Sequence, residues 1–146
     1  MKVSTRGRYG LRAMVDLAVT ENTGATPLRE ISERKDISEQ YLEQLFASLR
    51  KAGIVKSVRG AHGGYLLNHK AEEITVKDII VALEGPIAPV DCVLSEDECD
   101  KSSDCVTHKV WVKVKKNIDE LLESVTLAEL KEEYKNRKTT DFIYHI

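Results

Sequence analysis

The stretch ISERKDISEQYLEQLFASLRKAGIVKSVRGAHGGYLL, residues 31–67, decides the fold of this chain. It begins inside one helix, turns at DIS, and continues into a second helix over residues 38–52, which Ser38 caps and Gly53 ends. Apolar residues recur in that second helix at helical spacing: Tyr41, Leu42, Leu45, Phe46 and Leu49. The strand IVKSV, the glycine-rich turn RGAHGG and a strand beginning YLL then predict a β-hairpin.

The residues before this stretch add two helical signals. Residues 6–20 carry apolar side chains at helical spacing, and Thr26 is placed to cap a helix with Pro27 at its first position. Three helices followed by a hairpin form a winged helix-turn-helix. With 146 residues, the chain has room for about one domain. We therefore predict a mainly α fold with a small β-hairpin wing.

The second half predicts a short helix, a polar loop and a long helix. Thr75 caps the helix VKDIIVALE, which Gly85 closes, and Thr107 is placed to cap the long helix. The sequence TLAE is a capping box for a last short helix, and the tail TTDFIYHI has a β-like pattern. We predict a DNA-binding domain over residues 1–85, a loop over 86–106, and a dimerisation helix with its tail over 107–146.

The long helix has an apolar stripe that a small completed domain leaves uncovered. Its members include Trp111, Val114, Ile118, Leu121 and Leu122. Such a stripe needs a partner surface, and the symmetric solution is a homodimer. The alternative is that the helix packs back on its own domain.

Charge and motif together favour double-stranded DNA as the ligand. Residues 1–60 carry a net charge of +4 and residues 61–146 one of −6. The second helix of the turn motif would enter the major groove, where Gln reads adenine and Glu accepts from cytosine. A cationic wing tip suits a narrow minor groove. The candidate DNA-binding residues are Ser38, Glu39, Gln40, Tyr41, Glu43, Gln44, Arg59, Gly60 and His62. The alternative for each one is a solvated surface position.

The loop DCVLSEDECDKSSDCVTH, residues 91–108, contains all three cysteines of the chain. The spacing is C-x(6)-C-x(5)-C-x(2)-H, formed by Cys92, Cys99, Cys105 and His108. A metal would order a loop that has too few apolar residues to order itself. The wide gaps favour an iron–sulfur cluster, because structural zinc sites usually include a short C-x(2–4)-C pair. Zinc, or three redox-sensing thiols without metal, remain as alternatives.

Other classes of protein find little support in the sequence. No apolar run is long enough to span a membrane, and the N-terminus MKVSTRGRYG has no apolar core of a secretory signal. We therefore expect a cytoplasmic protein with no membrane contact, where structural disulfides are rare. No nucleophile–base pair or flavin motif indicates an enzyme. An iron–sulfur electron carrier is the alternative from another class.

Three segments carry a specific resemblance: STRGRYGLRAMVDLA, residues 31–67, and the three-cysteine loop followed by THKVW. They resemble the IscR-type iron–sulfur cluster regulators. These belong to a winged-helix family that also includes the nitric-oxide sensor NsrR and the cysteine-metabolism regulator CymR. The resemblance covers about residues 1–130. It implies a homodimer on a dyad-symmetric operator, with the second helix of the turn motif in the major groove and Arg59 in the minor groove.

The IscR branch also implies a 2Fe–2S cluster held by three Cys and one His, which correspond to Cys92, Cys99, Cys105 and His108. The cluster-assembly machinery would then be the cluster donor, and iron–sulfur biogenesis genes the targets. Two departures are visible: six residues separate the first two cysteines where IscR-type loops have five, and the tail is closer to CymR. Arg8 stands where NsrR has an acidic ligand. A repressor sensing redox state, nitric oxide or cysteine metabolism is the alternative within the family.

Overall fold

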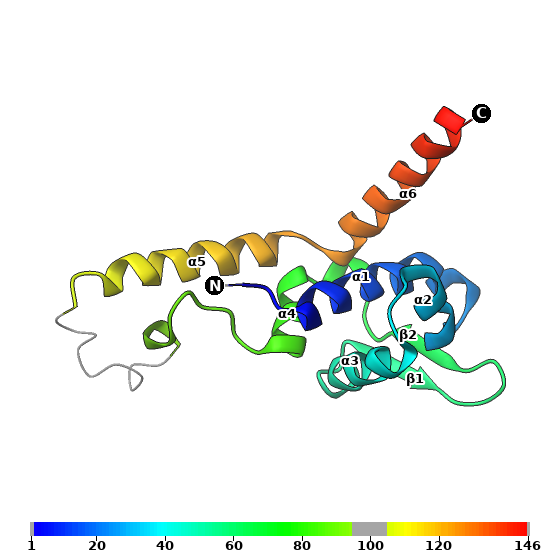
Figure 1. Ribbon diagram of the computed structural model, residues 1–146, viewed down its shortest axis with the longest axis horizontal. Coiled ribbons are helices and arrows are strands. Elements are labelled where there is room, and N and C mark those ends of the chain that lie inside the picture. Colours follow the sequence, from blue (N-terminus) through cyan, green and yellow to red (C-terminus); the bar gives the residue numbers. More distant parts are fainter. Residues whose placement is uncertain (1, 95–104, 146) are drawn as a thin grey trace.

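The computed structural model describes the backbone of residues 2–94 and 105–145, with side chains described as far as residue 138. In chain order the helices and strands are α1 (Thr5–Thr20), α2 (Leu28–Lys35), α3 (Glu39–Lys51), β1 (Val55–Val58), β2 (Gly64–Leu67), α4 (Val76–Glu84), α5 (His108–Ser124) and α6 (Leu127–His145). Short 3-10 turns lie at η1 (Glu21–Thr23), η2 (Ala71–Glu73) and η3 (Asp91–Val93). The antiparallel hairpin beside α3 completes the expected winged helix-turn-helix (Figure 1).

The core lies between the first four helices, the base of the wing and the start of α6. Its largest fully buried side chains include Met14, Leu17, Ile31, Leu42, Phe46, Ile79 and Leu127. The apolar stripe predicted for α3 is buried at Leu42, Leu45, Phe46 and Leu49, and only Tyr41 stays half-buried. Removing this apolar surface from water supplies most of the stabilisation, and it holds the buried face of α3 against the core.

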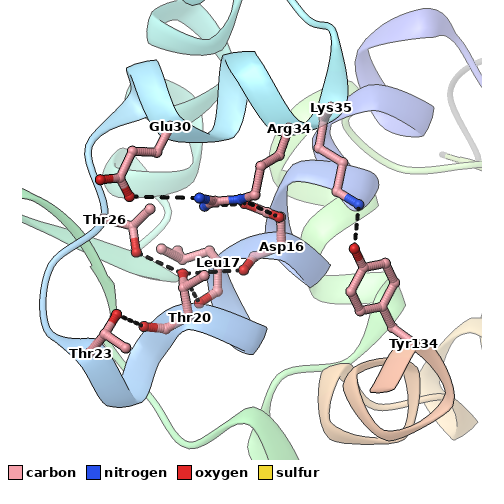
Figure 2. Close-up of polar contacts among 9 residues, drawn as sticks. All are labelled: Asp16, Leu17, Thr20, Thr23, Thr26, Glu30, Arg34, Lys35 and Tyr134. Carbon is pink, nitrogen blue, oxygen red and sulfur yellow. Dashed lines mark hydrogen bonds and ion pairs between the residues drawn. The ribbon is translucent and has the colours of Figure 1, made fainter. Parts of the chain in front are cut away.

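A buried carboxylate joins α1 to α2. Asp16, with a side chain 3% exposed, accepts hydrogen bonds from Arg34 Nε (3.0 and 3.2 Å) and Arg34 Nη2 (2.8 Å). Glu30 lies 3.7 Å from the same guanidinium, as Figure 2 shows. A paired, hydrogen-bonded charge is tolerated inside a protein, whereas an isolated one is not. This ion pair therefore fixes the first helix of the turn motif, α2, against α1.

The expected cap of α2 is wrong. Thr26 does not cap the helix, because α2 begins at Leu28 and Pro27 occupies the N-cap position without a side-chain bond. Instead, the Thr26 hydroxyl contacts that of Thr20 at 2.7 Å (Figure 2). The Thr26 backbone pairs with Tyr65, through N–H···O distances of 3.0 and 2.9 Å. Thr26 thus links the wing to α1.

The expected short last helix and β-like tail are both wrong, since α6 is a single helix of 19 residues, Leu127–His145. Thr126 Oγ1 accepts from the Glu129 N–H at 3.2 Å, so the predicted start of this helix is confirmed. The Arg137–Glu133 pair (2.5 Å) then supports the helix at i,i+4 spacing. Lys35, at the end of α2, contacts Tyr134 of α6 (Figure 2). In the described part of the chain, no helix is long and apolar enough to cross a membrane.

Candidate nucleic-acid interface and cysteine segment

The turn between α2 and α3 presents the start of α3 to solvent. Asp36 adopts a left-handed conformation (φ 53°), which Asp tolerates better than most residues and which allows the short connection. Ser38 Oγ then accepts from the Tyr41 N–H at 3.2 Å and caps α3. Ser38, Glu39, Gln40, Glu43 and Gln44 are all exposed, on the side opposite the buried stripe. The structure therefore places the predicted base-reading residues together on one accessible face.

Tyr41 is held by α1, a contact that the sequence analysis did not anticipate. Its ring meets the ring of Tyr9 edge to face, with centroids 6.2 Å apart. The Arg12 guanidinium lies 5.5 Å from the centroid of Tyr9. Tyr9 and Arg12 therefore extend the polar and cationic surface beside α3. Their i,i+3 spacing on the first helix is the signal that points to a shared face.

The wing carries the other predicted contact residues at its tip. Val58 pairs with Gly64, and Arg59, Gly60 and His62 follow β1 as exposed residues. Gly60 has a φ of 114°, a backbone conformation that residues with a Cβ atom rarely adopt, so this turn requires glycine. Figure 1 shows the loop projecting past the body from strands that lie beside α3. Arg59 and the exposed face of α3 are thus presented by neighbouring elements.

Two of the predicted metal ligands lie side by side. Cys92 belongs to η3 and His108 is the first residue of α5, and Cys92 Sγ lies 3.4 Å from His108 Nδ1. These residues are 16 positions apart in the chain, and η3 packs against α5. The fold therefore brings a thiol and an imidazole to the N-terminal end of the long helix.

Cys105 is the third described ligand candidate. Its Sγ lies 3.2 Å from Thr107 Oγ1, and this hydrogen bond, with the backbone N–H groups of His108 and Thr107, lowers the pKa of the Cys105 thiol. Thr107 occupies the N-cap position of α5 as predicted, but its hydroxyl makes no capping bond, since it contacts Cys105 instead. Hydrogen bonds that favour a thiolate favour a metal ligand.

The donor set fits an iron–sulfur cluster or zinc. Cys92, Cys105 and His108 offer two sulfurs and one imidazole nitrogen, the donors that both groups accept. Cys99, the remaining predicted ligand, lies outside the described residues. Within the described ranges, no three His, Cys, Asp or Glu side chains are already gathered around one point. The Cys92–His108 contact joins two of the four predicted ligands.

Helix α5 extends away from the body with no residue fully buried (Figure 1). It packs against α4, where Lys77 pairs with Glu123 at 2.6 Å. Of the five predicted interface residues, Val114, Ile118 and Leu122 are half-buried, whereas Trp111 is 38% and Leu121 64% exposed. The amphipathic pattern is confirmed, and part of its apolar surface remains open to solvent.

Comparison with known proteins decides the family. The family model described as Rrf2, iron-dependent transcriptional regulator, matches residues 3–133. The chain belongs to the Rrf2 family. It is 46% identical over 130 residues to the HTH-type transcriptional regulator CymR of Bacillus subtilis, a match that covers 89% of each chain. It is 42% identical over 130 residues to the transcriptional regulator IscR of Erwinia tasmaniensis, covering 89% of this chain and 78% of that one.

Solved structures confirm the Rrf2 fold. CymR of B. subtilis, described as its global cysteine regulator, superposes with a TM-score of 0.75 at 41% identity, covering 91% of this chain and 98% of that chain. IscR of T. potens superposes with a TM-score of 0.74 at 48% identity, covering 92% and 88%. The predicted family resemblance and the predicted winged-helix fold are confirmed. The predicted class of protein, a DNA-binding transcriptional regulator and not an enzyme, is confirmed by the same relatives. The chain is similar to CymR and to IscR to a comparable degree.

Proposed function

We propose that this Rrf2-family chain is a cluster-sensing transcriptional regulator that acts as a homodimer on a dyad-symmetric operator. The contact between Cys92 Sγ and His108 Nδ1, at 3.4 Å, carries the proposal. It brings two of the four predicted ligands together in a chain whose fold is that of DNA-binding regulators. The ligands would be Cys92, Cys99, Cys105 and His108, and a 2Fe–2S cluster held there would supply a redox-sensitive bond between η3 and α5.

The chain's own residues account for the DNA-binding part of the proposal. Glu43 and Gln44 have the hydrogen-bonding groups that read base edges in the major groove, and both are exposed on α3. Arg59 at the wing tip supplies positive charge for phosphate or a narrow minor groove. The division into a DNA-binding domain (1–85), a cluster loop (86–106) and a dimerisation segment (107–146) belongs to the same proposal.

A homodimer follows from the open apolar surface of α5. Trp111 and Leu121 would lie against the same helix of a second copy, since a two-fold axis lets one surface complement itself. The dimer would place two α3 helices about 34 Å apart, one turn of DNA. We place the dimer in the cytoplasm, with iron–sulfur biogenesis genes as targets and the cluster-assembly machinery as cluster donor.

A second candidate is a thiol-responsive regulator of cysteine metabolism that uses no metal. The lowered pKa of the Cys105 thiol and the 46% identity to CymR favour it. The two candidates differ in what switches DNA affinity. Only a cluster sensor changes its operator affinity when the cluster is removed under conditions that keep all thiols reduced.

The test is a gel-shift titration of a palindromic promoter fragment with cluster-loaded and cluster-free protein, both kept under strict anaerobiosis with reductant. A difference in affinity between the two forms supports cluster sensing. Equal affinity, together with a change on mild thiol oxidation, supports the thiol-responsive candidate. Absence of any shift on all promoter fragments tested contradicts both.

A further inference from the structure

Side chains at the end of α4 pack against the start of α1. A Cβ atom added at Gly7 would collide with the carboxylate of Glu84, and one added at Gly10 would collide with the side chain of Leu83. Both glycines are buried. Glycine at positions 7 and 10 therefore lets the side chains of Glu84 and Leu83 lie directly against α1.

Glu84 fastens this approach with hydrogen bonds. Its Oε1 accepts from the backbone N–H of Ser4 at 2.7 Å and of Gly7 at 3.1 Å, and also from the Ser4 hydroxyl. The N–H groups at the start of a helix have no partners within the helix itself. The carboxylate from α4 therefore completes the first turn of α1.

Arg6 adds a third helix to the contact. Its Nε donates to the carbonyl oxygen of Leu83 at 3.0 Å, and its Nη2 donates to Ser48 Oγ at 2.8 Å. Leu83 lies in the last turn of α4, and Ser48 lies on α3. The guanidinium is planar, so two bonds from one fork fix the distance and the angle between their acceptors. Arg6 therefore ties α3 to the end of α4.

The end of α4 is also where the cysteine segment begins. The chain leaves α4 at Gly85, with a φ of 83°, and reaches Cys92 in η3. We propose that Arg6 is a positioning residue that couples the orientation of α3 to the root of the cysteine segment. When the chain at the end of α4 is displaced, the Leu83 carbonyl moves with it, and the Arg6 guanidinium that is bonded to this carbonyl also moves. The bond from Arg6 to Ser48 then changes the orientation of α3, the helix that reads DNA. The coupling to ligand state rests on the function proposed above.

Ser48 offers the cleanest variant. Ser48→Ala removes the acceptor for Arg6 on α3, together with a long hydrogen bond (3.4 Å) from Ser48 Oγ to the Gln44 carbonyl oxygen of the same helix. Ala is a better helix former than Ser, so the helix remains folded. Ser48→Thr keeps the hydroxyl and serves as the matched rescue. Arg6→Met removes both hydrogen bonds but keeps a long side chain. We expect Ser48→Ala and Arg6→Met each to weaken operator binding by roughly tenfold, the effect of losing one bond to a charged donor. Ser48→Thr behaves as wild type.

The double variant separates coupling from direct DNA contact. If Arg6 acts through Ser48, Arg6→Met with Ser48→Ala weakens operator binding no further than Arg6→Met alone. The ratio of operator affinities between cluster-loaded and cluster-free forms falls toward one in both single variants. If Arg6 instead contacts a phosphate, Arg6→Met alone reduces the salt dependence by about one phosphate, and Ser48→Ala changes nothing. That result would overturn the proposal.

Amide hydrogen exchange tests the same link without DNA. We expect Ser48→Ala to accelerate exchange at residues 81–85, on a different helix from the substitution, and Ser48→Thr to leave it unchanged. Unchanged exchange there in Ser48→Ala contradicts the coupling. A wild-type protein that binds no operator refutes the proposed function but leaves this exchange test valid, so the two failures can be distinguished.

Discussion

Arg34 donates three hydrogen bonds to Asp16, whose side chain is 3% exposed, across the interface of α1 and α2. Arg34 itself is 37% exposed, so most of the cost of breaking the pair falls on the carboxylate left behind in the core. The Arg34–Asp16 pair also raises the pKa of the Arg34 guanidinium, chiefly through the hydrogen bond to Asp16. The packing of α1 against α2 thus depends on the buried carboxylate of Asp16, whose principal partner is Arg34.

Removing that partner is expected to destabilise the protein. Arg34→Met should lower the free energy of unfolding by about 3 kcal/mol, because a buried carboxylate is then unpaired. Urea unfolding followed by circular dichroism measures it. Glu30→Gln is the control: Glu30 is 47% exposed and 3.7 Å from the same guanidinium, so we expect a change of at most about 0.5 kcal/mol. Equal effects of the two substitutions would show that burial of Asp16 is unimportant.

Glu43 is expected to act in specificity rather than affinity. It is exposed on α3, where a carboxylate repels phosphates but accepts from cytosine. Glu43→Ala should relax the sequence preference while total affinity stays the same or rises. Binding to a randomised operator library measures this, with Glu33→Ala on α2 as an exposed acidic control. A uniform loss of affinity across all operators would contradict the prediction.

Arg59 is expected to contribute charge from the wing tip. Arg59→Ala should weaken binding to every sequence and reduce the slope of affinity against salt by about one phosphate contact. If Arg59 also enters a narrow minor groove, the loss should be larger at A·T-rich sites. Arg137→Ala, on α6 and paired with Glu133, is the control that should leave the slope unchanged. Unchanged affinity of Arg59→Ala at all salt concentrations refutes this role.

The exposed apolar residues of α5 are expected to hold the dimer. Leu121 is 64% exposed, so a glutamate at this position would remain in water in a monomer. In a dimer interface the same carboxylate would be buried without a partner. Leu121→Glu should therefore raise the dimer dissociation constant at least tenfold. Analytical ultracentrifugation measures this. Lys116→Ala, on the charged side of α5 next to Glu120, should leave the dimer intact. A monomeric wild type, or a Leu121→Glu dimer of normal affinity, contradicts the assignment.

Much of this architecture follows from local signals. Ser38, Thr75 and Gly85 lie at helix ends where they were predicted, because a cap depends on one side chain and its neighbouring backbone. Thr26 and Thr107 also stand just before predicted helices, yet neither hydroxyl caps a helix. Their hydroxyls contact Thr20 and Cys105 instead, since tertiary contacts compete with local ones for the same oxygen.

Long-range contacts were beyond the sequence analysis for a similar reason. Nothing in the spacing of Arg6 and Ser48, 42 positions apart, indicates that they meet. The tail TTDFIYHI, residues 139–146, has apolar residues in a β-like pattern, but a capped helix begins before it and continues to His145. The cysteine spacing did predict that Cys92 and His108 approach each other, because a shared ligand requires it.

Replacing the imidazole by a thiolate tests the role of His108. His108→Cys should retain a cluster, because thiolate is a competent ligand, but should lower its reduction potential, since an anionic ligand stabilises the oxidised state. His108→Ala is the matched variant, which offers no replacement donor and should lose cluster. Redox titration of the visible absorbance measures the potential. An unchanged potential in His108→Cys shows that His108 is not a ligand.

The most direct test of cluster sensing is the metal and sulfide content of the wild-type protein, prepared under strict anaerobiosis, alongside its visible spectrum. We predict about two iron and two sulfide per chain, with charge-transfer absorbance, and loss of both in Cys92→Ala, Cys99→Ala and Cys105→Ala. A colourless protein with one zinc per chain and no sulfide would contradict the cluster and leave the DNA-binding regulator in place.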